Sequence, residues 1–69
     1  MHEDIEITTY DRLLRAWENS MELTRDFEMY SKRIEDNQEA VKVFKKFAED
    51  EGVHASTLHS MLLDYHKKS

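Results

Sequence analysis

The sequence predicts an all-α fold, an antiparallel two-helix hairpin that dimerises into a four-helix bundle. Two observations lead to this fold class. A single glycine and no proline among 69 residues leave little material for the turns of an all-β protein. Apolar side chains also recur at steps of three and four residues through two long stretches, which is the spacing of one helix face.

The first helix is predicted over residues 10–35. The arm before it, residues 1–8, alternates only weakly between apolar and charged residues, so we expect it to be flexible. Thr8 followed by Asp11 has the spacing of a capping box, which marks a helix start. The predicted inward face of this helix then consists of Tyr10, Leu13, Trp17, Ser20, Thr24, Phe27, Ser31 and Ile34.

The second helix is predicted over residues 37–66. The charged segment from Glu35 to Glu39 interrupts the apolar rhythm and indicates a tight turn between two helices. Asp36 followed by Glu39 again has capping-box spacing, so Asp36 is the predicted N-cap. Beyond the turn, helical spacing continues through Ala40, Phe44, Phe47, Ala48, Glu51, His54, Ala55, Leu58, Met61, Leu62 and Tyr65.

The length and the apolar content of the chain predict association. A single domain of 69 residues buries only ~60% of the surface that its unfolded chain exposes, so it is marginal alone. The absence of cysteine excludes disulfides as the source of extra stability. Seven aromatic residues and four methionines exceed what one hairpin can cover. We therefore expect a homodimer or a higher homo-oligomer, with another helical protein as the alternative partner.

Composition excludes several other classes of function. A net charge of −5 argues against nucleic acid, because phosphate binding needs an excess of Lys and Arg. The longest apolar run, from Met61 to Leu63, is far shorter than the ~20 residues that cross a bilayer, so no membrane partner is expected. The first residues do not resemble a signal peptide, which predicts a cytoplasmic protein.

Two ionisable residues fall within the apolar stripe of the second helix. We take the direction of Ala40 and Leu58 as the middle of this stripe. At ~100° per residue, Glu51 lies ~20° from the middle and His54 lies ~40° to the other side. Both are therefore expected to point into the core, where a carboxylate costs several kcal/mol unless it is paired, protonated or bound to a cation. In metal-binding carboxylate bundles, a Glu-x-x-His pair delivers one oxygen and one nitrogen ligand. Glu51 and His54 are thus candidate metal ligands.

The region around Glu51 and His54 resembles a known protein family. The stretch FKKFAEDEGVHA, residues 44–55, is similar to the second helix of a rubrerythrin-type or ferritin-like half-bundle. Tyr30 and the charged turn are similar to the same hairpin's first helix, so the resemblance covers residues 16–65. A free-standing two-helix unit of this kind resembles the encapsulated ferritin-like proteins. This resemblance implies a di-iron site at a subunit interface, with ferroxidase or peroxide chemistry and with Glu51 and His54 among the ligands.

The first helix departs from the family's pattern. The family places a bridging Glu on the inward face, about two turns before its Tyr, whereas Leu23 stands seven residues before Tyr30 here. Antiparallel packing puts Glu22 at the height of Glu51, but the helical wheel places Glu22 on the solvent side. Glu18 also lies far off the inward face, and Glu28 is too distant along the helix. No carboxylate of the first helix has both the right height and the right direction.

Two hypotheses follow for Glu51 and His54. In the first, two copies of the pair meet across a two-fold axis and bind Fe, or Mn or Zn, with open positions for oxidation or peroxide chemistry. In the second, no metal is bound, and Glu51 forms hydrogen bonds with His54 and with Ser20 or Thr24. The hairpin is then a protein–protein interaction or regulatory module. Residues 60–64 are similar, at three of five positions, to the Ser-Gln-Glu-Leu-Asp motif of short sporulation-type phosphatase inhibitors, which have that shape.

Overall fold

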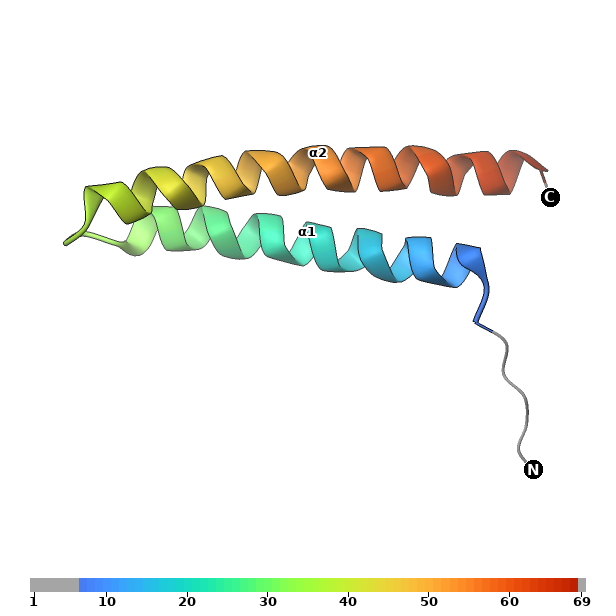
Figure 1. The fold of residues 1–69 in the computed structure, drawn as a ribbon, viewed down its shortest axis with the longest axis horizontal. Helices are drawn as coiled ribbons and strands as arrows, with labels where there is room; N and C mark the ends of the chain where they lie inside the picture. Colours follow the sequence, from blue (N-terminus) through green and yellow to red (C-terminus); the bar gives the residue numbers. More distant parts are fainter. Residues whose placement is uncertain (1–6, 69) are drawn as a thin grey trace, which may run out of the picture.

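The computed structural model describes residues 7–68, with side chains for residues 7–65, and these form an antiparallel helical hairpin (Figure 1). Helix α1 spans Thr9–Arg33 and helix α2 spans Gln38–Lys68. The predicted two-helix, strand-free hairpin is therefore confirmed over the described part of the chain. Most of the predicted flexible arm, residues 1–6, lies outside the described residues. No described helix carries an apolar stretch long enough to cross a membrane.

Helix α1 begins at the predicted capping box. The Thr8 hydroxyl oxygen accepts a hydrogen bond from the backbone N–H of Asp11 at 3.1 Å, and the Asp11 carboxylate accepts one from the backbone N–H of Thr8 at 3.1 Å. These two bonds satisfy donors that have no partner within the helix. At the other end, Ile34 adopts an extended conformation, and α1 ends two residues before the predicted boundary.

Helix α2 is capped by Asn37, so the prediction of Asp36 as its N-cap is wrong. The Asn37 side-chain oxygen accepts a hydrogen bond from the backbone N–H of Ala40 at 3.0 Å, and its carbonyl accepts one from Val41 at 3.2 Å. Asn37 immediately precedes the first helical residue, so its short side chain reaches the third N–H of the helix. Residues 34–37 therefore lie between the two helices, three more than the single residue that the predicted boundaries left there.

Ring contacts between the helices fix their register. Phe27 of α1 contacts Phe44 of α2, with ring centroids 5.7 Å apart, and Trp17 stacks on His59 at 5.4 Å. On α1, Leu23 lies a little less than halfway from Phe27 to Trp17. On α2, Glu51 lies a little less than halfway from Phe44 to His59. These two residues are therefore level with each other to within about one helical turn.

The core between the helices is thin. Three apolar side chains are buried, and the other two buried residues are serines; they are Ala48, Ala55, Leu62, Ser20 and Ser31. None of the large described side chains is fully enclosed. Small residues along the line of contact allow the helices to approach closely, but they remove little apolar surface from water.

The exposed side chains show the same deficit. Large apolar residues of both helices, Leu23, Phe47 and Met61 among them, are more than one third exposed.

Candidate metal centre

One side of the hairpin carries a row of exposed, mostly apolar side chains on each helix, here called the open face. It is formed by Leu23 and Tyr30 of α1 and by Phe47, His54 and Met61 of α2, each set spaced by seven residues along its helix. Its four apolar side chains are between 38% and 45% exposed. Contacts of Phe47 with Phe27 and of Tyr30 with Phe44 place both edges on the same side of the hairpin.

An aromatic cluster occupies the end of the open face nearest the turn. Phe27 and Phe44 are half-buried between the helices, and Phe47 and Tyr30 stand outside them. The ring centroids of Phe27 and Phe47 are 5.7 Å apart, and those of Tyr30 and Phe44 are 5.3 Å apart. Within a single hairpin, the prediction that Phe47 belongs to the inward face of the second helix is wrong, because its side chain lies at an edge of the contact and is 45% exposed.

Glu51 and His54 lie in the middle of the open face, between Phe47 and Met61. The His54 Nδ1 and the Glu51 Oε1 are 3.5 Å apart, as expected for residues three positions apart on a helix. The Glu51 side chain is 21% exposed and the His54 side chain is 60% exposed. The predicted interior position therefore holds in part for Glu51 and is wrong for His54 within one hairpin.

The direction of the contact explains this difference. The prediction took Ala40 and Leu58 as the middle of the inward face, but the most buried residues of α2 are Ala48, Ala55 and Leu62. On the helical wheel these three point ~60° away from the predicted direction. The rotation moves His54, with Phe47 and Met61, from the interior to the open edge.

The hydrogen bonds of α1 do not form the predicted metal-free network. The Thr24 hydroxyl donates to the backbone carbonyl of Ser20 at 2.8 Å, within its own helix, and so does not donate to Glu51. A hydroxyl four residues after a carbonyl commonly forms this bond in helices. His54 is therefore the predicted partner that does contact Glu51.

The residues present do not fit the di-iron group that the resemblance implies. Among the described residues, no three Asp, Glu or His side chains come close enough to hold one ion. Leu23 occupies the position on α1 that is level with Glu51 and on the open face. Asp50 bonds to Lys46 at 3.0 Å, and this hydrogen bond and the charge of Asp50 raise the pKa of Lys46. One hairpin thus offers two ligands, Glu51 and His54.

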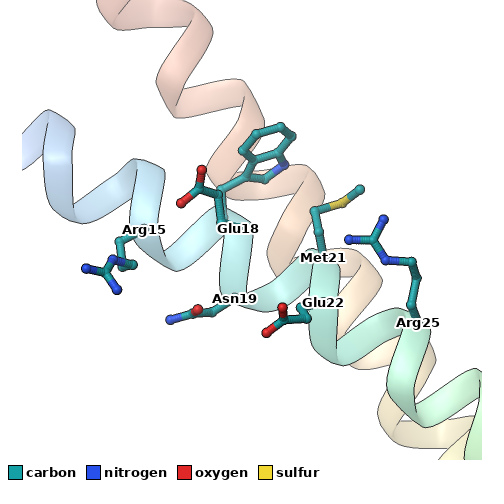
Figure 2. Close-up of a pocket in the computed structure, with 7 residues that line it drawn as sticks. Arg15, Glu18, Asn19, Met21, Glu22 and Arg25 are labelled. Carbon is teal, nitrogen blue, oxygen red and sulfur yellow. The ribbon is translucent and has the colours of Figure 1, made fainter.

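The carboxylates of α1 lie elsewhere on its surface. Glu22 and Asn19 project from the side of α1 that faces away from α2 (Figure 2). Glu18 and Glu28 are also exposed. The predicted solvent-side position of Glu22 therefore agrees with the structure, and α1 contributes no carboxylate to the open face at the level of Glu51.

The opposite side of the hairpin contains a shallow hollow of about 370 Å³, lined by Trp17, Met21, Thr24, Gly52, Ala55, Ser56 and His59. His59 stacks on Trp17 with an angle of 23° between the ring planes. The sequence did not predict this stack, because Trp17 and His59 are far apart in the chain and no motif links them.

No protein-family model matches the chain, and comparisons with curated proteins and with solved structures found no match either. The resemblance to ferritin-like half-bundles therefore rests on the residues of the hairpin itself.

Proposed function

We propose that this chain is a ferritin-like metal-binding module that acts as a homodimer. Two hairpins join through their open faces into a four-helix bundle, and two Glu51–His54 pairs meet at its centre around one divalent ion of iron, manganese or zinc. The observation that carries this proposal is the position of the pair, in the middle of an exposed and otherwise apolar face.

The pattern of α2 favours a second copy as the occupant of the open face. A two-fold contact brings the same patch of each subunit together, so it requires a pattern that is complementary to itself. About the midpoint between Glu51 and His54, large apolar residues of α2 stand at matching distances in both directions, with Phe47 opposite Leu58 and Phe44 opposite Met61. In an antiparallel contact of two copies, Glu51 of one copy would lie beside His54 of the other, and apolar residues would lie beside apolar residues on either side of them.

Burial explains why an ion is expected at this place. A carboxylate in an apolar interface costs several kcal/mol unless a cation or hydrogen-bond donors compensate it. Two carboxylates and two imidazoles carry a charge of about −2, which one divalent ion neutralises. Oxygen and nitrogen ligands of this kind suit zinc, iron and manganese. Because α1 adds no carboxylate, the proposal is metal binding, without a redox reaction.

The test compares metal binding by matched histidine variants. Untagged protein is titrated with Zn²⁺, with Mn²⁺ and, without oxygen, with Fe²⁺, and native mass spectrometry counts the ions per dimer. Removing an outer-shell partner of a metal ligand typically lowers affinity 10–100-fold, so we expect Glu51→Ala and His54→Ala to lose at least that much. His59→Ala removes a histidine on the opposite side and should bind normally. A wild-type dimer that takes up none of these ions would overturn the proposal, as would equal losses in the His54 and His59 variants.

A second candidate function is a metal-free interaction module, and Leu23 is the observation that favours it. An apolar side chain level with Glu51 extends the apolar surface of the open face instead of completing a ligand set. In that case, Glu51 of one hairpin pairs directly with His54 of its partner. The dimer would then have the same stability with and without a chelator, whereas the metal-binding proposal requires the chelator to weaken it.

A further inference from the structure

We propose that the contact between Trp17 and His59 responds to pH and joins the two helices more strongly in mild acid. Protonation of His59 converts a stack of two neutral rings into a cation–π interaction across the hairpin. Both residues lie on the side opposite the open face, so this response requires neither a metal ion nor a second copy of the chain.

The geometry of the two rings already suits a cation–π interaction. Trp17 of α1 is half-buried, and His59 of α2 is exposed. Their ring centroids are 5.4 Å apart and their planes are nearly parallel, with an angle of 23° between them. A cation within about 6 Å of the centroid of a Trp ring is attracted by the negative face of the indole. The imidazole therefore needs no rearrangement to form this interaction once it is protonated.

The surroundings of His59 leave the indole as the group that meets its charge. Among the described residues, His59 forms no ion pair, and the hollow beside it is lined by no Asp, Glu, Lys or Arg. On α2, the residues one turn before and after His59 are uncharged, and Asp64 lies ~140° around the helix. Four charged residues of α1 around Trp17 line a neighbouring depression; they are Arg15, Glu18, Glu22 and Arg25 (Figure 2).

The charge of the imidazole sets the direction of the effect. Histidine is the side chain that commonly changes its charge between pH 5 and pH 8. The added attraction is present below the pH at which the imidazole loses its proton, and it disappears as the pH rises through that value. Because His59 is exposed, its charge stays in contact with water and costs little desolvation. At an exposed site, this attraction shifts the unfolding equilibrium about two- to five-fold toward the folded hairpin.

The first measurement is the fluorescence of Trp17, the single tryptophan of the sequence. A protonated imidazole in contact with an indole quenches its emission, so we expect the emission of the wild type to fall from pH 8 to pH 5. His59→Phe keeps an aromatic ring against Trp17 but takes up no proton, and its emission should not fall; His59→Gln should behave in the same way. His54→Ala removes a histidine from the open face and should titrate like the wild type. An equal fall in the wild type and in both His59 variants would overturn the proposal.

The second measurement is urea denaturation of the wild type and of His59→Phe at both ends of this pH range. Helical circular dichroism follows unfolding at one protein concentration, with a chelator present so that the release of metal adds no pH dependence. Carboxylates that take up protons in acid do so in both proteins, so the comparison isolates His59. From pH 8 to pH 5, the unfolding equilibrium should shift about two- to five-fold in favour of the wild type. A difference that stays constant, or that shifts toward the variant, would overturn the proposal and leave the proposed function of the open face untouched.

Discussion

Gly52, the single glycine of the sequence, lies where its identity disfavours the helix. It lies within α2, has no positive φ, and a Cβ added there would meet no atom within 4 Å. Glycine in a helix interior costs ~1 kcal/mol relative to alanine. We therefore predict that Gly52→Ala raises the free energy of unfolding by about 0.5–1 kcal/mol, measured by urea denaturation at fixed protein concentration.

Ala48→Gly provides the reverse comparison. Ala48 is buried between the helices, so its replacement loses helix propensity and packing together and should lower the free energy of unfolding by more than ~1 kcal/mol. If Gly52→Ala were destabilising instead, the space beside Gly52 would have to be filled by another subunit in solution, on the side opposite the open face.

The relation between Glu51 and His54 illustrates how far residue-level prediction reaches. Their spacing predicted a shared helix face, and the 3.5 Å contact agrees. Their burial was harder to predict. A helical wheel shows which residues of one helix share a face, but it does not show which face the neighbouring helix covers. Ala48 and Ala55 mark the actual line of contact, since small residues allow the helices to approach there. Ala40 and Leu58, which the wheel favoured, lie to one side of this line.

At the scale of the helices, capping is the feature that the sequence predicted best and also the one where it made an error. Thr8 and Asp11 form the predicted capping box, because both required side chains stand at the only spacing that allows it. Asp36 and Asn37 are adjacent and have similar side chains, so local preference does not choose between them. The turn geometry selects Asn37, whose side chain bonds to the N–H of Ala40.

The cap of α1 gives a prediction at this scale. Thr8→Ala removes the side-chain oxygen that accepts from the N–H of Asp11, and it should lower the free energy of unfolding by about 1 kcal/mol. Faster amide hydrogen exchange should accompany this change in the first turn of α1 and not at its C-terminal end. Thr9→Ala is the matched control, because Thr9 is exposed and forms no cap. Equal destabilisation by the two variants would contradict a capping role for Thr8.

At the scale of the whole molecule, the sequence predicted incomplete burial from aromatic and methionine counts alone. The structure locates the uncovered surface more narrowly than the counts allowed. Exposed Phe47 and Met61 gather on the same side as Leu23, while the opposite side carries the hollow beside Gly52. Residue counts alone could not predict this asymmetry. It arises because the inward direction of α2 differs by ~60° from the predicted one.

This asymmetry yields the prediction that tests the assembly. Phe47→Asp places a charge on the open face and should weaken dimerisation by about 2–4 kcal/mol per dimer, or roughly 30- to 700-fold in Kd. Val53→Asp is a demanding control, because Val53 is more exposed, at 64%, but lies outside the open face. Sedimentation at micromolar concentration should find the Phe47 variant as a monomer of reduced helix content and the Val53 variant as a dimer. A dimer that tolerates Phe47→Asp but is dissociated by Val53→Asp would place the interface on another side of the hairpin.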